Sequence, residues 1–371
     1  MREKATTAMV GFGTSEITRY SDRGMTAFAL EAALAAIADA GLTREDVDGY
    51  IGAPWATNQG AVHAHGADEI CYRPFLKALG IEHLRYGADL YKGFPTDMVV
   101  AAAHALLAGE CRYVLGVRAL YNLKGVDYAT SASRQAWGDD QFVQPYGLGT
   151  VGARFATRIR RYMERWGVSR HDLFEVIALS RRNAARNPVA IWRNRQISLD
   201  EYLDAPMVAS PHCLFDCDIP VCGAMAFVMS RSSDVPSAAA PAFLKGWSGH
   251  QRPWDVFDDS GVSAQDVDQC QLYDGFSSMV YEWLEGFRWC EEGQAWKFIR
   301  DGHADVDGCL PVNTFGGSLG EGRLHGMGHV REGYLQTAGK AGERQLSASD
   351  HCLVQVGPYD SSSFVLLCRE P

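Results

Sequence analysis

Hydrophobic and polar positions divide the chain into short apolar runs that alternate with longer helix-forming segments. Ala8–Gly13 has the length and apolar character of a buried strand, whereas the alanine-rich Met25–Ala40 favours a helix that ends at Gly41. The apolar Gly49–Gly52 follows a polar turn, and Pro95–Leu107 predicts a helix inside the core. This alternation is typical of an α/β fold.

The same succession returns late in the chain. Residues 41–48 (GLTREDVD) and 261–268 (GVSAQDVD) match in order, and each leads into an apolar run. Residues 109–116 and 349–356 form a second pair, in which a polar turn precedes a strand. Repeated βα units in the same order predict an internally duplicated α/β fold.

Residues 119–210 interrupt the duplicated pattern and predict an inserted loop or lid region, with amphipathic helices at Gly149–Arg165 and Arg170–Asn187. A central strand, Gly223–Met229, resumes the pattern. The Pro/Ala/Ser-rich residues after it mark the predicted boundary between two halves, which are residues 1–236 and 237–371.

Composition and charge narrow the classes of function. The 371 residues are 47% hydrophobic and 22% charged, which is typical of a globular protein. A formal net charge of −10 and the lack of a lysine or arginine cluster argue against a nucleic-acid partner. No run approaches the roughly 18 apolar residues of a membrane span, and the first residues lack the apolar core of a secretory signal. We therefore expect a cytoplasmic chain.

The ten cysteines are scattered, which in a cytoplasmic chain predicts small buried side chains and no disulfide framework. Only Cys213, Cys217 and Cys222 cluster, with His212 beside them. Structural zinc sites usually contain a Cys-x-x-Cys pair, which this cluster lacks. We therefore expect no metal site.

A glycine-rich segment, residues 313–329 (NTFGGSLGEGRLHGMGH), lies between the strand-like Leu310–Val312 and the helix-competent Val330–Gln336. Glycine allows a backbone to approach a ligand closely. A glycine-rich turn between a strand and a helix is where α/β proteins present backbone N–H groups and catalytic side chains. The segment therefore marks a candidate functional site.

These features together resemble the thiolase superfamily over nearly the whole chain. The matching segments are residues 46–48 (DVD), 223–226 (GAMA) and 313–317 (NTFGG). The sterol-carrier or lipid-transfer thiolases have a strand that ends in His-Asp-Cys-Phe, where this chain has residues 273–276 (YDGF). The resemblance implies a duplicated five-layer α-β-α-β-α fold with an inserted loop domain, and a homodimer.

The catalytic groups of a thiolase are missing. A thiolase acylates a cysteine at the N-terminus of a buried helix; that position falls near Lys92, and no cysteine lies between Cys71 and Cys111. Arg323 stands where the resemblance places the activating histidine, and residues 356–360 lack the second catalytic cysteine. Without a thiol no acyl-enzyme can form, so we do not expect a thiolase.

Residues 320–327 (GEGRLHGM) most resemble the steroid side-chain-cleaving aldolases of the lipid-transfer-protein type. Those aldolases cleave a β-hydroxyacyl-CoA by retro-aldol chemistry, together with a partner that carries an OB-fold and a zinc ribbon. The resemblance implies the same partner here, coenzyme A as the carrier of the substrate, no cofactor bound by the chain, and Tyr273 as an acid/base residue. Their second active-site tyrosine falls on Arg323.

A retro-aldol step needs a base for the β-hydroxyl proton and a donor for the enolate that is left on the thioester. Tyr273 is a candidate base if Arg323 stabilises its phenolate. Alternatively, Arg323 or His325 stabilises the thioester oxygen. The structural alternatives are a core tyrosine at position 273 and a histidine at position 325 that ties the loop to backbone carbonyls.

Five further residues are expected around the substrate. Lys92 could form a Schiff base at the helix N-terminus, or be a solvated lysine in a turn. Asp274 follows the candidate tyrosine and could instead cap a turn. His329 lies in the glycine-rich segment, and Tyr359 and Asp360 occupy the place of the missing second cysteine.

Two functions stay open on the sequence. One is a thiolase-like carbon–carbon lyase that performs retro-aldol cleavage, or the reverse addition, on a β-hydroxyacyl-CoA. The other is a catalytically degenerate subunit that binds an acyl-CoA or lipid, or serves as a scaffold in a multi-enzyme complex. The polar set of Tyr273, Arg323, His325 and Tyr359 favours the enzyme.

Overall fold

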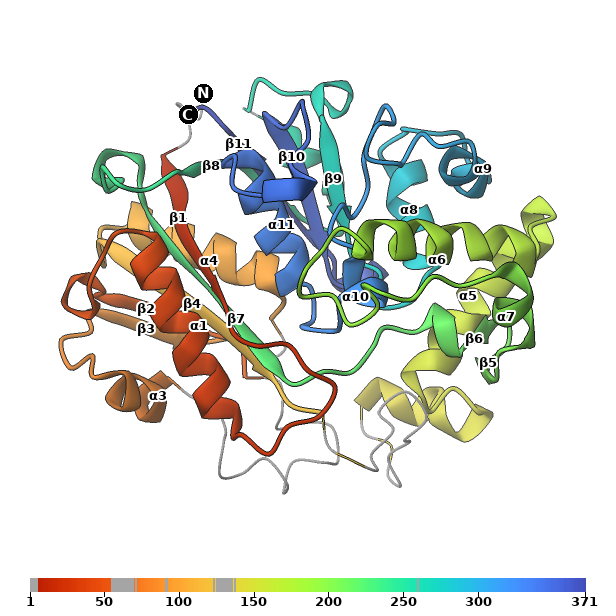
Figure 1. The fold of residues 1–371 in the computed structure, drawn as a ribbon, viewed down its shortest axis with the longest axis horizontal. Coiled ribbons are helices and arrows are strands. Elements are labelled where there is room, and N and C mark those ends of the chain that lie inside the picture. Colours follow the sequence, from red (N-terminus) through yellow and green to blue (C-terminus); the bar gives the residue numbers. More distant parts are fainter. Residues whose placement is uncertain are drawn as a thin grey trace.

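The computed structural model describes residues 6–54, 70, 72–90, 93–122, 124, 136, 138–258 and 260–371. Its nine main strands form one mixed sheet in the order β3-β2-β4-β7-β1-β8-β11-β10-β9 (Figure 1). These strands are β1 Thr7–Thr14, β2 Gly49–Gly52, β3 Tyr86–Asp89, β4 Tyr113–Leu120, β7 Gly223–Arg231, β8 Ala242–Gly249, β9 Gln269–Leu272, β10 His351–Val356 and β11 Ser363–Cys368. A separate two-stranded sheet consists of β5 Met207–Ala209 and β6 His212–Cys213.

The described part of the chain contains ten α-helices. They are α1 Met25–Asp39, α3 Tyr72–Leu79, α4 Pro95–Leu107, α5 Val151–Trp166, α6 Arg170–Ala184, α7 Leu199–Asp204, α8 Met279–Gly286, α9 Ala295–Arg300, α10 Gly317–Gly320 and α11 Met327–Thr337. The predicted strands and helices at residues 8–13, 25–40, 95–107 and 223–229 are confirmed, because their apolar patterns match the observed burial.

The internal duplication is confirmed by equivalent pairings in the two halves. β2 pairs in parallel with β4, and β9 pairs in parallel with β10. The carboxylate of Asp48 accepts hydrogen bonds from the backbone N–H groups of residues 112 and 113, at 2.8 and 3.0 Å. Asp268 accepts the same pair from residues 350 and 351, at 2.8 and 2.9 Å. Each aspartate thus fixes the start of the neighbouring strand.

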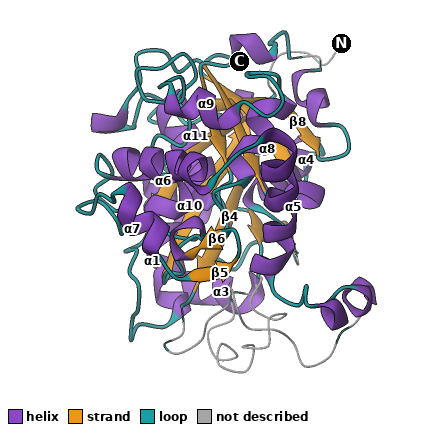
Figure 2. Ribbon diagram, turned by 90° about the vertical axis from the view of Figure 1, so that its right-hand side faces the viewer, coloured by secondary structure: helices purple, strands orange, loops and turns teal. Residues whose placement is uncertain are grey.

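Two helices lie between the halves and produce the five layers. α4 packs against β2, β4 and β7 of the first half and against β10 and β11 of the second, while α11 packs against β9, β10 and also β1. Alternate residues of β7 divide between layers: Met225 and Phe227 join the cluster around α4, and Ala226 and Val228 join the cluster around α1. Figure 2 shows helices on both sides of the strands. The predicted α-β-α-β-α arrangement is confirmed.

The insert packs beside the C-terminal half. Helix α6 packs against α9 and α7, and Tyr162 of α5 contacts Tyr281 of α8 (Figure 1). The amphipathic helices predicted over residues 149–165 and 170–187 correspond to α5 and α6, with each end within three residues of the prediction. This places side chains of the insert close to the end of β9, where Tyr273 follows.

One expectation differs from the structure. Leu310–Val312 makes only an isolated bridge between Val312 and Cys270, because Pro311 has no N–H to donate to a strand ladder. The division into halves at residue 236 stays a prediction: the residue lies in the connection between β7 and β8, and β1 pairs with both of these strands. None of the helices in the described ranges is long and apolar enough to cross a membrane.

Candidate active site

One cavity of about 330 Å³ brings together Tyr273, Arg323 and His325, the three predicted catalytic residues. We call it the Tyr273 cavity. The other residues that line it are Phe94, Val151, Arg154, Phe155, Asp218, Gly275, Phe276, Met279, Pro358 and Ser361. It therefore collects side chains from both halves and from α5 of the insert, and no cysteine is among the described residues of its wall.

Tyr273 directly follows β9 and is held by its neighbour β10. Its N–H donates to the side-chain oxygen of Gln355 at 2.9 Å, and its ring packs edge-on against His329 with centroids 5.7 Å apart. Burial and the charge of Asp218 raise the pKa of Tyr273 well above its ordinary value, against the opposing effect of Arg323. The phenol therefore keeps its proton at neutral pH. The raised pKa does not favour the phenolate on which the predicted base depends, and the part that Tyr273 plays in the reaction stays a prediction.

His325 lies between two guanidinium groups. Its Nε2 is 2.8 Å from Nη1 of Arg323, and its Nδ1 contacts Nη2 of Arg118. Burial, together with these two positive charges, lowers the pKa of His325 well below its ordinary value. The imidazole is therefore neutral, and a neutral ring has only one nitrogen that can accept a hydrogen bond from the two arginines. The other nitrogen carries a proton.

The backbone at His325 explains why glycines surround it. His325 has a left-handed φ of 48°, and Gly326 follows with a φ of 95° at the start of α11. A Cβ at Gly326 would lie 2.1 Å from a methyl of Val356, so only glycine fits there. The glycine-rich segment therefore turns tightly enough to direct His325 toward β4.

Arg118 was not identified from the sequence. It lies on β4, is 1% exposed, and donates to the backbone oxygens of Ala53 at 2.7 Å and Gly93 at 3.3 Å. Burial lowers the pKa of Arg118 to about 9. The sequence feature that could have identified Arg118 is that it is the single charged residue inside the apolar run Tyr113–Leu120. An isolated charge of that kind does not show what it faces.

Asp218 is a second residue that the sequence did not reveal. It lies between β6 and β7, is 4% exposed, and its N–H donates to the Gly275 oxygen at 3.1 Å. The next residue, Ile219, accepts from the backbone N–H of Arg323 at 2.7 Å, so Asp218 and the glycine-rich segment are joined. Burial raises the pKa of Asp218 to about 8, although Arg323 opposes the shift. A carboxyl group with this pKa can accept and return a proton near neutral pH.

Asp274 and His329 support the cavity from behind. Oδ1 of Asp274 accepts from the Ser318 N–H at 2.7 Å and lies 3.1 Å from Nε2 of His329, and Oδ2 accepts from the Leu319 N–H at 3.3 Å. Both side chains are buried and neither lines the cavity. Asp274 therefore caps α10, which is the turn-capping alternative raised by the sequence, and His329 packs between Asp274 and Tyr273.

Tyr359 and Asp360 lie beside the Tyr273 cavity without lining it. Tyr359 lines a neighbouring cavity of about 350 Å³ and stacks under the guanidinium of Arg158, 4.1 Å from its ring centre. Asp360 forms an exposed ion pair with the same Arg158 at 2.8 Å. The ring of Phe155 lies between, 5.5 Å from Tyr359 and 5.0 Å from Phe276. Lys92 falls outside the described residues.

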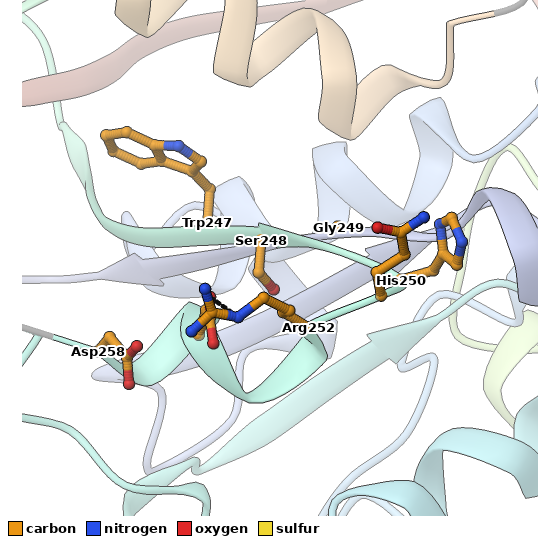
Figure 3. A pocket seen from close by; sticks show the side chains of 8 residues that line it. Trp247, Ser248, Gly249, His250, Arg252 and Asp258 are labelled. Carbon is orange, nitrogen blue, oxygen red and sulfur yellow. Dashed lines mark ion pairs between the residues drawn. The ribbon is translucent and has the colours of Figure 1, made fainter.

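A polar cavity of about 520 Å³ at the end of β8 shares no residue with the Tyr273 cavity (Figure 3). Its wall includes His250 and an ion pair between Arg252 and Asp255 at 2.9 Å. Within the described ranges, no group of three or more histidine, cysteine, aspartate or glutamate side chains could hold a metal ion. Of the predicted site residues, Tyr273, Arg323 and His325 line the Tyr273 cavity, and Tyr359 lines the neighbouring one.

Several known proteins are similar to this chain. Residues 252–369 match the family model described as thiolase C-terminal domain-like. A 17-hydroxy-3-oxo-4-pregnene-20-carboxyl-CoA lyase from Mycobacterium tuberculosis is 30% identical over 97% of this chain and 98% of its own. A steroid side-chain-cleaving aldolase from Thermomonospora curvata is 32% identical over 88% of each chain. The solved structure of an Ltp2-ChsH2(DUF35) aldolase has a TM-score of 0.85 at 27% identity and covers 98% of both chains.

Proposed function

Because the chain belongs to the thiolase superfamily and is an aldolase-type lyase similar to the steroid side-chain-cleaving aldolases, we propose that it cleaves a β-hydroxyacyl-CoA with a bulky polycyclic group on its β-carbon. One observation carries the proposal: a protonated tyrosine, a carboxyl group that titrates near pH 8 and an arginine–histidine pair line the same cavity. A retro-aldol step needs a proton donor, a base and groups that stabilise an enolate oxygen, and these residues can serve as all three. The class of substrate is taken from the name of the Mycobacterium relative.

In the proposed reaction the carboxylate of Asp218 removes the proton of the β-hydroxyl. The bond between Cα and Cβ breaks, the oxygen on Cβ becomes a ketone, and the electron pair moves onto the thioester as an enolate. Arg323 and the protonated nitrogen of His325 stabilise the enolate oxygen. The phenol of Tyr273 then returns a proton to Cα, and the proton on Asp218 restores the phenol by way of solvent.

Arg118 acts on this reaction through His325. Its guanidinium can only donate, so Nδ1 of His325 accepts from Arg118 in the tautomer whose Nε2 carries the proton. In that tautomer Nε2–H and Nη1 of Arg323 are both donors, so the proposal directs both at the thioester oxygen. Nε2 is the nitrogen near Arg323, on the side of the cavity. Arg118 is therefore proposed as a positioning residue that turns the donor nitrogen of His325 toward the thioester oxygen.

We also propose that the chain works with a partner subunit. The support is the similar Ltp2-ChsH2(DUF35) structure, whose name joins two components. An OB-fold and zinc-ribbon partner, a homodimer of this chain, and coenzyme A as the carrier with no bound cofactor are parts of the same proposal. The residues named above belong to this chain, so the partner is assigned no step of the chemistry.

The test is an assay of the chain purified with a co-expressed zinc-ribbon and OB-fold protein. The substrate is a polycyclic β-hydroxyacyl-CoA, and mass spectrometry follows release of the ketone and the shortened acyl-CoA. Tyr273→Phe is expected to lower kcat by about 10²-fold or more, because it removes the proton donor. Tyr146→Phe serves as the matched control, since Tyr146 is 82% exposed and outside the cavity.

Release that is equal in the wild type and in Tyr273→Phe would contradict the assigned role of the phenol. No release from the wild type, with acyl-CoA binding retained, would favour the non-catalytic binding subunit instead.

A further inference from the structure

A larger cavity of about 580 Å³ lies on the other side of the segment that carries Asp218. We call it the Trp192 cavity. Asp218 lines both this cavity and the Tyr273 cavity, so the proposed base stands where the two meet. Much of the wall is apolar, formed by Ile191, Trp192, Val208, Leu214 and Phe215. A space of this size with apolar walls suits a large, rigid ligand body.

Two residues in the wall of the Trp192 cavity are hydrogen-bonded to the glycine-rich segment. The backbone N–H groups of Ile191 and Trp192 donate to the oxygens of Glu321 and Gly320, both at 3.1 Å. Arg323, which lines the Tyr273 cavity, comes two residues after Glu321. The wall of one cavity therefore fixes the position of a charged residue in the other.

Arg181 is one of the polar residues in the wall of the Trp192 cavity, with Arg19, Asn122 and Asp218. It is 3% exposed, its Nη1 donates to the Leu319 oxygen at 2.9 Å, and its guanidinium stacks on Trp192 at 4.4 Å. No carboxylate of the described residues forms an ion pair with it. A buried guanidinium without a carboxylate partner is costly unless acceptors surround it. A ligand oxygen would supply such an acceptor.

We propose that the Trp192 cavity binds the carbonyl fragment of the substrate, a polycyclic ketone with a second oxygen that accepts a hydrogen bond from Arg181. This assignment rests on the proposed function and adds where each product lies. The thioester fragment occupies the Tyr273 cavity. The bond that is cleaved, which joins the two fragments, then lies beside Asp218, where the two cavities meet. The ketone formed at Cβ then lies beside the carboxyl group that took its proton.

The assignment is tested by calorimetric binding of androst-4-ene-3,17-dione, a steroid with a ketone at each end of its ring system, to the protein without acyl-CoA. Arg181→Met is expected to weaken binding by about tenfold or more, because it removes a charged donor from a buried oxygen. Val208→Trp fills the cavity and is expected to abolish binding. If Val208→Trp does not fold, Val208→Phe replaces it as a smaller obstruction.

Two variants serve as matched controls that should bind like the wild type. Arg182→Met changes the next residue of α6, whose exposed side chain pairs with Asp305 at 2.7 Å. Val189→Trp adds the same bulk at a position that is 39% exposed and outside the cavity. Circular dichroism and thermal melting of every variant establish that each one is folded.

The outcomes separate this assignment from the proposed function. Ketone binding that depends on Arg181 and Val208, without any turnover, refutes the lyase and leaves a steroid-binding cavity. If the wild type turns over substrate but neither substitution changes ketone binding, the lyase function stands and the assignment of the cavity is refuted. Absence of ketone binding to the wild type at its solubility limit also refutes the assignment.

Discussion

The substitution Asp218→Asn removes the proposed base and keeps the shape of the side chain. Asp218 is 4% exposed, and its pKa of about 8 compares with an ordinary value of 3.8. The base is the ionised form, so the wild-type rate should follow the ionised fraction. Asparagine cannot accept the hydroxyl proton at any pH between 5 and 10.

The magnitude follows from the pKa. With a pKa of about 8, Asp218 is ionised to about 1% at pH 6, about 10% at pH 7 and about half at pH 8. Wild-type kcat/KM should therefore rise about tenfold for each pH unit up to pH 7.5 and level off above pH 9. Asp218→Asn should lose this rise and lower the rate at pH 9 by about 10²–10⁴-fold.

The stability of the fold provides an independent measurement. A carboxyl group whose pKa is raised by folding binds its proton more tightly in the folded state, so stability falls as pH rises from about 4 to about 8. Asparagine stays neutral and avoids that loss. Asp218→Asn should therefore gain in Tm relative to the wild type at pH 9, and much less at pH 4.

The assay is a pH series of ketone release from the complex with its partner, for the wild type, Asp218→Asn and Asp218→Glu. The glutamate variant restores a carboxyl group and should recover part of the activity together with a rising pH limb. An Asp218→Asn enzyme that keeps both the wild-type rate and the rise near pH 8 would refute the assignment of the base.

Three further substitutions test how the site is supported. Asp274→Ala leaves the N–H groups of Ser318 and Leu319 without their acceptor and should lower the free energy of unfolding by about 1–3 kcal/mol in urea denaturation; no change would mean that the cap is dispensable. Gly317→Ala should cost at least about 2 kcal/mol, because its φ is +65° and the new Cβ would lie 1.9 Å from Oδ2 of Asp274; a wild-type Tm would contradict this. Asp360→Asn breaks only the exposed pair with Arg158 and should change stability by less than about 0.5 kcal/mol, so a larger loss would show that Asp360 does more than its exposure indicates.

The main strands and helices, and their internal duplication, could be predicted from the sequence. Alternating and continuous apolar patterns identified the strands and helices, because burial on one or both faces determines those patterns. The glycine-rich segment was predicted to be part of the site, and the structure shows that its backbone is left-handed at residues 316, 317 and 326, which favours glycine there.

The chemistry of the cavity could not be obtained in the same way. Arg118 and Asp218 are single charges within apolar surroundings, and only the packing of the two halves shows that they face His325 and Arg323. The resemblance made Tyr273 a candidate, but its protonation state depends on burial, which no local sequence pattern reports. Tyr359 follows Pro358, a residue of the cavity wall, while its own ring lines the neighbouring cavity.

The contact between His325 and Arg118 joins the two duplicated halves, and this has a consequence for how the chain could have evolved. β4 and β10 are equivalent strands, but only β4 carries a buried arginine, and only the C-terminal half carries the tyrosine and the histidine. The two copies therefore contribute different residues to the one site. A chain cut in the connection between β7 and β8 would yield two fragments that each retain part of an ancestral unit, and neither would hold a complete set of reactive groups.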